Sequence, residues 1–236
     1  GRIWEMPCVV PSDWEAQNLH GKNNPATVED WKRALDITVL KKGTFNLVFH
    51  PHGWIRNDQM VNFIDYAQEK YGKRVLFLNF KEVQQRLDSH LLKGNPVRAE
   101  NGGDNGVRTV DVNNDGFMDI LIGNAKSKLT RIWNPDEGTW SEAAFPTDFS
   151  SAKGLFASVD KKGYPAYITS TSAWQFNGKE WVKAPQLLAG LDKIKSQLSR
   201  NAACRFLDIH NDGKTELLLS TPQETTIFSW SDLKKS

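Results

Sequence analysis

Asp111-Val-Asn-Asn-Asp-Gly-Phe-Met-Asp119 is the stretch that decides the fold of the second half of this chain, and it returns as Asp208-Ile-His-Asn-Asp-Gly-Lys-Thr-Glu216. We call these stretches the first loop and the third loop. Short strand-like runs precede each of them, at 107–110 and 204–207, and follow each of them, at 120–122 and 217–219. A tryptophan, Trp133 or Trp230, stands 14 residues after the last acidic residue of each loop. A spacing repeated in this way indicates a duplicated structural unit.

A degenerate copy, which we call the middle loop, fills the interval as Ser158-Val-Asp-Lys-Lys-Gly-Tyr-Pro-Ala166. Trp174 and Trp181 follow it with the same separation as Trp133 and Trp140. The three loops start at residues 111, 158 and 208, which are 47 and 50 residues apart. This period, with about four short strands per unit, is typical of β-propeller blades. The sequence therefore predicts about three blades, at roughly residues 106–150, 153–190 and 202–236.

The first loop places oxygen-bearing side chains at its positions 1, 3, 5 and 9 and a glycine, Gly116, at position 6. Alternate residues of a tightly curled loop point toward one centre, and glycine permits the turn. Carboxylate, amide and carbonyl oxygens are hard ligands that suit Ca²⁺ and not Zn²⁺. The predicted calcium ligands are Asp111, Asn113, Asp115, Asp119 and the backbone carbonyl of Phe117.

The other two loops depart from this pattern. In the third loop the corresponding positions are Asp208, His210, Asp212 and Glu216. Because histidine is an unusual calcium ligand, the sequence leaves calcium binding there open. The middle loop has Lys162 and Ala166 at ligand positions, so we expect it to hold no metal, with an ion pair between Lys162 and Asp160 in place of the cation.

The loops and their flanking strands resemble the FG-GAP repeat, also called VCBS-like, of integrin-type β-propellers. The resemblance covers roughly residues 104–236 and implies structural Ca²⁺ that neutralises the carboxylates and fixes a turn between strands. Two alternatives stay open at this point. The loops could be plain Asp/Asn-rich turns, and the tryptophans could either pack between blades or form a platform for sugars.

The first half has a different pattern. Helical spacing follows Thr27 and Asp58, and each helix is predicted to end at a glycine. Phe45–Phe49 and Arg74–Phe80 are apolar runs that favour buried strands, and a last helix is predicted over residues 81–92. Strands alternating with helices indicate a parallel sheet covered by helices. We therefore expect a partial parallel α/β domain at residues 1–95, a linker at 96–105, and all-β blades at 106–236.

Two histidines, His50 and His52, follow directly on the first apolar run, where α/β sheets bind their ligands. This region resembles the closing segment of polysaccharide deacetylases, in which a histidine after a late strand is the catalytic acid. The resemblance implies that His50 is that acid and that His52, Trp54 and Trp14 bind the glycan. The segment around Trp4 is expected to lie near the same groove.

The family's metal site is missing from the sequence. It requires an early pair of aspartates and a His-x-x-x-His pair, and none of the five histidines are four residues apart. Zn²⁺ or a similar ion is therefore expected only in a full-length deacetylase domain, and this chain alone is not expected to be catalytic. A self-contained metal enzyme that uses His50, His52 and a carboxylate such as Asp13 or Glu15 is the weakest alternative.

The composition limits the function. Thirty Lys and Arg against 28 Asp and Glu give a net charge of +2, so a dedicated nucleic-acid binder is not expected. No apolar run approaches the roughly 20 residues of a membrane span. The leading interpretation is a piece of a secreted, periplasmic or cell-surface deacetylase with a propeller that binds polysaccharide or a cell-surface ligand, and with further blades in the parent chain. The alternative is a non-catalytic calcium-stabilised adhesion or scaffold module with a degenerate α/β remnant.

Overall fold

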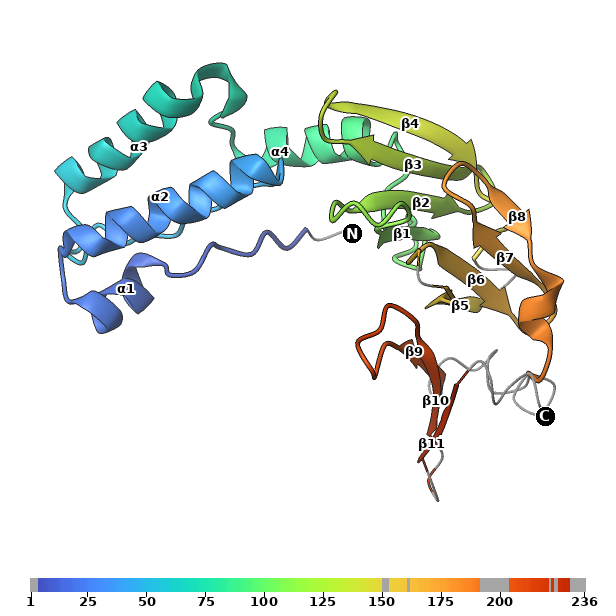
Figure 1. Ribbon diagram of the computed structural model, residues 1–236. Helices are drawn as coiled ribbons and strands as arrows, with labels where there is room; N and C mark the ends of the chain where they lie inside the picture. Colours follow the sequence, from blue (N-terminus) through green and yellow to red (C-terminus); the bar gives the residue numbers. More distant parts are fainter. Residues whose placement is uncertain are drawn as a thin grey trace. The chain divides into compact units, whose positions relative to one another are not determined.

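The computed structural model of the chain describes residues 4–149, 153–160, 162–191, 204–220, 222 and 225–229. The chain divides into two compact units, residues 2–86 and residues 87–236. The first is helical, and the second is built from three antiparallel sheets (Figure 1). We call them the helical unit and the sheet unit. In the part of the chain that the structure describes, no helix is long and apolar enough to cross a membrane.

The helical unit contains four α-helices within residues 4–86, namely α1 (Asp13–His20), α2 (Pro25–Leu40), α3 (Asn57–Tyr71) and α4 (Phe80–Arg86). Local signals start the longest of them. The side chain of Asn24 accepts a hydrogen bond from the backbone amide of Ala26 at 3.0 Å, and Pro25 occupies the first turn. Both features are favourable at a helix N-terminus. Helices were predicted close to α2, α3 and α4, whereas α1 was not predicted, and a short 3₁₀ turn, η1 (Gly72–Arg74), follows α3.

The core of the helical unit lies between α2 and α3. Trp31 is completely buried, and its ring meets that of Phe63 edge-on at a centroid distance of 5.9 Å. The indole nitrogen of Trp31 donates a hydrogen bond to the carbonyl of Pro11 at 2.8 Å, so its polar atom is also satisfied. Leu35 and Ala67 complete the contact between the two helices.

The parallel α/β sheet predicted for the first half is wrong. No strand is assigned within residues 4–86: the first apolar run has no regular secondary structure, and the second lies between the last residue of η1 and the first residue of α4. One backbone hydrogen bond, from Val9 to Asn46 at 2.7 Å, links the first run to another segment. Val48, Phe49 and Phe77 are 42%, 47% and 59% exposed. An apolar run forms a buried strand only when neighbouring strands satisfy its backbone, and these runs have no such neighbours in the described residues.

The sheet unit contains three sheets whose neighbouring strands are antiparallel and consecutive in sequence. Sheet 1 comprises β1 (Val107–Val110), β2 (Asp119–Gly123), β3 (Lys128–Asn134) and β4 (Thr139–Ala144). Sheet 2 comprises β5 (Gly154–Ser158), β6 (Pro165–Thr169), β7 (Ala173–Phe176) and β8 (Trp181–Lys183), and η3 (Pro185–Leu188) follows it. Sheet 3 comprises β9 (Cys204–Leu207), β10 (Glu216–Ser220) and β11 (Thr225–Phe228) among the described residues. Each of the three loops joins the first two strands of one sheet, as the repeat predicts.

Aromatic side chains fill the space between sheets 1 and 2. Phe145 and Phe149 stack at a centroid distance of 4.8 Å, and both meet Tyr167 of β6. Between sheets 2 and 3 the core is aliphatic and includes Ile168 and Leu217. The sheets therefore pack face against face in sequence order, and each loop lies beside the next.

A short π-helical turn, η2 (Leu87–Leu91), belongs to the sheet unit. The guanidinium of Arg131 on β3 donates hydrogen bonds to the carbonyls of His90, at 2.6 Å, and Leu91, at 2.5 Å. Glu142 of β4 pairs with Arg131 and also with Lys93 at 2.7 Å. These contacts attach residues 87–93 to sheet 1, so the boundary between the units lies before them.

Candidate functional site

The first loop closes on its own backbone. The carboxylate of Asp111 accepts hydrogen bonds from the amides of Asp115, at 3.1 Å, and Gly116, at 2.8 Å. Asp115 accepts the amide of Phe117 at 2.8 Å and the side-chain amide of Asn113 at 2.9 Å. The predicted ligand side chains at positions 1, 3 and 5 are therefore brought together in one tight turn.

Asp119, the last predicted ligand, is completely buried at the start of β2. Its two oxygens accept the backbone amides of Val112, at 2.9 Å, and Trp133, at 2.8 Å. Burial raises the pKa of Asp119 to about 6, and the charges of Asp115 and Asp111 add to the rise, although the two hydrogen bonds oppose it. Three carboxylates thus repel one another in the first loop, which a bound cation would relieve.

The third loop repeats the same hydrogen bonds. Asp208 accepts the amides of Asp212, at 3.0 Å, and Gly213, at 2.9 Å, as Asp111 does in the first loop. Asp212 accepts the amide of Lys214 at 3.0 Å. The two loops therefore share a backbone conformation as well as a sequence pattern.

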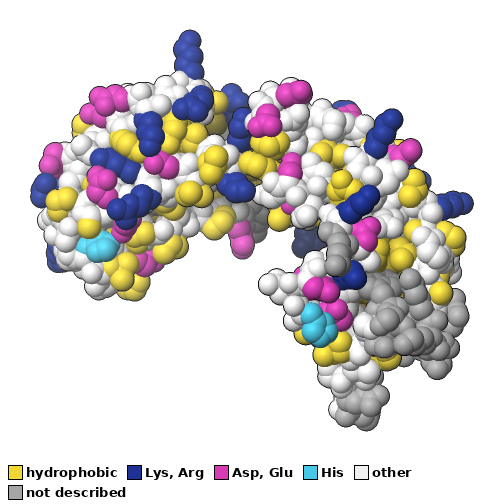
Figure 2. Space-filling view, in the orientation of Figure 1, with side chains coloured by type: hydrophobic (Ala, Val, Ile, Leu, Met, Phe, Trp, Pro, Cys, Tyr) yellow, Lys and Arg dark blue, Asp and Glu magenta, His cyan; other side chains and the backbone are white. Residues whose placement is uncertain are grey.

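The remaining predicted ligands of the third loop lie side by side. The Nδ1 atom of His210 is 3.2 Å from Oε1 of Glu216, and the other oxygen of Glu216 accepts the amide of Ile209 at 3.0 Å. Glu216 is buried, whereas the His210 side chain is 67% exposed. Figure 2 shows acidic side chains beside a histidine over the loop between β9 and β10.

The middle loop differs from its prediction in one respect. The carboxylate of Asp160 accepts the backbone amide of Lys162 at 2.9 Å and the side-chain amide of Gln175 at 2.9 Å. No ion pair between Lys162 and Asp160 occurs in the described residues, and Lys161, the other lysine beside Asp160, lies outside them, so replacement of the cation by a lysine stays a prediction. A neutral amide on β7 satisfies the carboxylate instead.

The donor chemistry of the first loop fits a hard cation, but its side chains are not arranged around a common centre. Three carboxylates, the Asn113 oxygen and the Phe117 carbonyl lie within nine residues. Among the described residues, no group of three or more His, Cys, Asp or Glu side chains is placed to hold a metal ion. Each carboxylate oxygen has more than one lone pair, so its bond to an amide still leaves it able to bind a cation. A cation would need the exposed carboxylates of the loop to turn toward it.

The tryptophans occupy different positions in sheets 1 and 2, although their spacing is equal. Trp133 and Trp140 pair directly across β3 and β4, whereas Trp174 pairs with Lys183 and Trp181 with Phe176. Trp181 packs between sheets, because its indole nitrogen donates to the Thr130 hydroxyl of sheet 1 at 2.9 Å.

The other tryptophans say less about the choice between packing and a platform for sugars. Arg131 lies over the Trp140 ring at 4.6 Å and covers part of its surface. Trp230 lies outside the described residues. Packing between sheets is therefore the role that the contacts of Trp181 support, and the sugar platform stays a prediction.

His50 of the helical unit is paired with a carboxylate that sequence reasoning considered only as a metal ligand. The Nδ1 atom of His50 is 2.8 Å from Oδ1 of Asp13, and its backbone amide donates to Oδ2 of Asp13 at 2.5 Å. The Asp13 side chain is completely buried, and the His50 side chain is 40% exposed. Glu15, the other carboxylate considered, bonds with Ser12 and caps α1. Val9 contacts Asn46, and four residues further along both segments Asp13 contacts His50. The two segments therefore run in the same direction.

Two of the three predicted glycan-binding residues lie beside His50. The ring of Trp54 is 4.8 Å from that of His50 and 4.2 Å from that of His52. Trp14 is next to Asp13 on α1 but is 51% exposed, and no contact with this cluster is described. We call His50, His52, Trp54 and Asp13 the histidine cluster.

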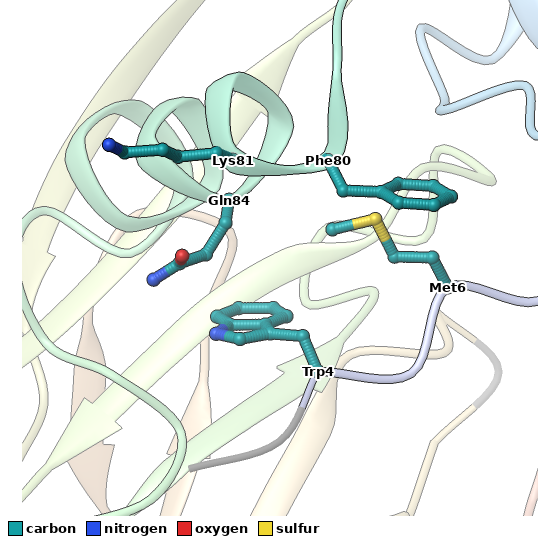
Figure 3. Close-up of a pocket in the computed structure, with 5 residues that line it drawn as sticks. All are labelled: Trp4, Met6, Phe80, Lys81 and Gln84. Atoms are coloured by element: carbon teal, nitrogen blue, oxygen red, sulfur yellow. The ribbon is translucent and has the colours of Figure 1, made fainter.

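A hollow of about 290 Å³ lies elsewhere in the helical unit, between the N-terminal segment and α4. Figure 3 shows the Trp4 ring facing Gln84, and Met6 beside Phe80. Lys81 completes the lining. The lining contains no member of the histidine cluster, so the position of Trp4 near the same groove stays a prediction.

Comparison of the chain with protein-family models, curated proteins and solved structures found no match. The assignment of function therefore depends on the chemistry of the loops and of the histidine cluster. The sequence did not predict the pairing of Asp13 with His50 or of Gln175 with Asp160, because these residues are brought together only by folding.

Proposed function

We propose that the sheet unit is a calcium-stabilised, non-catalytic module for binding or scaffolding, located outside the cytoplasm. The observation that carries this proposal is the shared hydrogen-bond pattern of the first and third loops. The two loops lie far apart in sequence, and each has carboxylates at positions 1 and 5. We infer that the same requirement maintains the hydrogen-bond pattern in both. Cation binding supplies one, since it offsets the repulsion that the clustered carboxylates create.

Calcium is the cation that the first loop suits best. All of its donors are oxygens, and they come from carboxylates, an amide and a backbone carbonyl. Asp111, Asn113 and Asp115 would hold the ion at the loop turn, with Asp119 at its base. Extracellular calcium modules bind with dissociation constants of roughly 10⁻⁴ to 10⁻³ M, which matches a loop without a dedicated bidentate glutamate. The partner we propose for such a module is a polysaccharide or another cell-surface ligand.

The test is calorimetric titration of Ca²⁺ into the chelator-treated protein. We expect binding in the range of about 10⁻⁴ M and a melting temperature raised by a few degrees at tenfold excess. Asp115→Ala should weaken binding at least about tenfold, because one charged ligand is lost. Asp136→Ala, in the exposed turn between β3 and β4, is the matched control. Equal heats for both variants would refute calcium binding by the first loop, and no heat for the unaltered protein at millimolar Ca²⁺ would refute calcium binding by both loops.

A second function is favoured by the histidine cluster. Asp13 is buried and fixes Nδ1 of His50, which directs the other ring nitrogen, Nε2, away from the carboxylate. This arrangement suits a general acid or base, because the carboxylate sets the tautomer and orientation of the imidazole. We propose His50 as a proton-transfer residue, with His52 and Trp54 as neighbours for a ring-shaped substrate such as a sugar. The deacetylase-like barrel itself is not part of this proposal, because the described residues form no parallel sheet.

Nitrogen-15 NMR of the histidine side chains tests this assignment. We expect the neutral His50 ring to carry its proton on Nδ1, and Asp13→Asn to shift the population toward the other tautomer. His90 of η2, which has no carboxylate partner described, serves as the internal reference. A His50 ring that shows the same tautomer mixture in both proteins would contradict the proton-transfer role.

A further inference from the structure

The first loop is not an isolated turn, because its Asn114 rests against the middle loop. Asn114 has a left-handed backbone conformation, with φ of 60°. Its side-chain nitrogen lies 3.5 Å from the carbonyl of Lys162. A Cβ atom on Gly163 would come within 2.7 Å of the same nitrogen, so only glycine leaves room for the Asn114 amide. Gly163 also has a positive φ of 74°, a backbone conformation that glycine adopts more readily than other residues.

The middle loop is itself held by the third loop. The backbone amide of Thr215 donates to the carbonyl of Ser158 at 2.8 Å, and the amide of Ser158 donates to the Thr215 hydroxyl at 3.0 Å. The Ser158 hydroxyl donates to the carbonyl of Gly213 at 2.8 Å. Ser158 occupies the position at which the other two loops have an aspartate, so the residue that could have bound a cation binds the neighbouring loop instead.

We infer that the middle loop, which lacks the ligands, acts as a strut that holds the backbone turn of the first loop, so that only the exposed carboxylates must turn toward a cation. This inference rests on the proposed calcium function of the first loop. Asn114 stands between two predicted ligands, Asn113 and Asp115, so its left-handed conformation sets the direction in which both side chains leave the chain. The contact of the Asn114 amide with the middle loop restrains that conformation before any ion arrives. Ordering the loop in advance lowers the entropic cost of binding.

The third loop provides an internal comparison. Asn211 occupies the position of Asn114 and has a similar φ of 55°. In the described residues its side chain makes no hydrogen bond to another loop. The backbone conformation is therefore the same in both loops, but only the first loop is held at this asparagine, whereas the third loop meets the middle loop through Gly213 and Thr215. The strut thus predicts tighter calcium binding by the first loop than by the third.

The experiment measures the calcium affinity of the first loop in a protein whose third loop carries Asp212→Ala. Asn114→Gly removes the seated amide but tolerates positive φ, and Gly163→Ala fills the space that the amide occupies. We expect each to weaken calcium binding about three- to tenfold, because one more residue must be ordered on binding. The control for Asn114→Gly is Asn211→Gly, because the Asn211 side chain makes no described hydrogen bond to another loop. The control for Gly163→Ala is Gly102→Ala, where φ is also positive, at +81°, and nothing lies within 4 Å of the added carbon. Both controls should leave the affinity unchanged.

A second readout needs no metal. In the calcium-free protein, hydrogen exchange at the amides of Asp115, Gly116 and Phe117 reports whether the first loop is closed. We expect these amides to exchange faster in Gly163→Ala than in Gly102→Ala. The calcium-free Asn114→Gly variant should have the same melting temperature as the unaltered protein. Unchanged exchange overturns the strut whether or not calcium binds. If calcium binds and the variants match their controls, the strut is overturned while the calcium function stands, and if no calcium binds, both fall.

Discussion

Asp13 and Asp119 are both buried aspartates, but their surroundings assign them different roles. Asp13 receives a ring nitrogen and a backbone amide of His50, so its charge is directed at one partner. Asp119 receives two backbone amides and faces the carboxylates of Asp111 and Asp115. A buried carboxylate beside a histidine suits proton transfer, whereas one beside other carboxylates suits a cation.

A third aspartate gives a test of charge at a single residue. Asp104 forms a two-point contact with the guanidinium of Arg108, one distance being 2.9 Å, and this contact lowers the pKa of Asp104 to about 2. A lowered pKa in the folded state stabilises the protein above pH 4, and the gain is lost as the pH falls from about 4 to 2. Both side chains are more than a third exposed, so solvent screening limits the gain to about 1 kcal/mol or less.

Urea denaturation of Asp104→Asn at several pH values measures this contribution. We expect a free energy of unfolding lower than that of the unaltered protein at pH 7 and equal to it near pH 2. Asn keeps an oxygen for the amide of Gly106, which Asp104 accepts at 2.9 Å, so the substitution isolates the charge. Asp136→Asn, in an exposed turn, is the control. A difference between Asp104→Asn and the unaltered protein that is constant from pH 7 to pH 2 would exclude the ion pair as its source.

At the scale of elements, one hydrogen bond joins sheets 1 and 2. The Thr130 hydroxyl on β3 is buried and accepts the indole N–H of Trp181 on β8. Thr130→Val keeps the shape of the side chain but leaves the indole N–H without an acceptor, which should cost about 1 to 3 kcal/mol. Thr139→Val, at an exposed position of β4, should change stability by about 0.5 kcal/mol or less. Equal stability of the two variants in urea would show that Trp181 contributes through its apolar surface alone.

The accuracy of the sequence predictions followed the range of the interactions involved. The helix that begins at Pro25 was predicted from Thr27, two residues late, because its apolar spacing is local; its cap is Asn24 and not Thr27. The strands at Phe45–Phe49 and Arg74–Phe80 were predicted wrongly, since a strand depends on distant partners that no local pattern specifies. The equal tryptophan spacing was misleading for the same reason, because strand register decides which residues are equivalent.

The same distinction applies to the candidate sites. The bonds within the first and third loops were predictable in kind, since they join residues at most seven apart. The pairing of Asp13 with His50, 37 residues away, and of Ser158 with Thr215, 57 residues away, depends on tertiary structure. The contact between loops, on which the strut depends, therefore carries no sequence signal except the glycine at position 163.

At the scale of the whole molecule, the two units differ in how well they cover their apolar side chains. The helical unit leaves large apolar residues exposed, including Val10, Ile37, Leu40, Phe77 and Phe80, at 59% or more. Figure 2 shows apolar side chains spread over its surface. In the sheet unit, β2 and β6 are buried along their whole length. Apolar surface left in water contributes nothing to stability, so we expect the helical unit to unfold first.

This difference predicts two transitions in differential scanning calorimetry, because each unit has a core of its own. Leu35→Ala in α2 and Leu121→Ala in β2 remove the same atoms from the two cores, at residues that are 3% and 0% exposed. Each should cost about 2 to 5 kcal/mol in its own unit and leave the other transition in place. Calcium should raise only the transition that Leu121→Ala lowers, since both candidate loops lie in the sheet unit. A single transition that both substitutions lower would mean that the units fold as one, and the calcium effect could then no longer be assigned to the sheets.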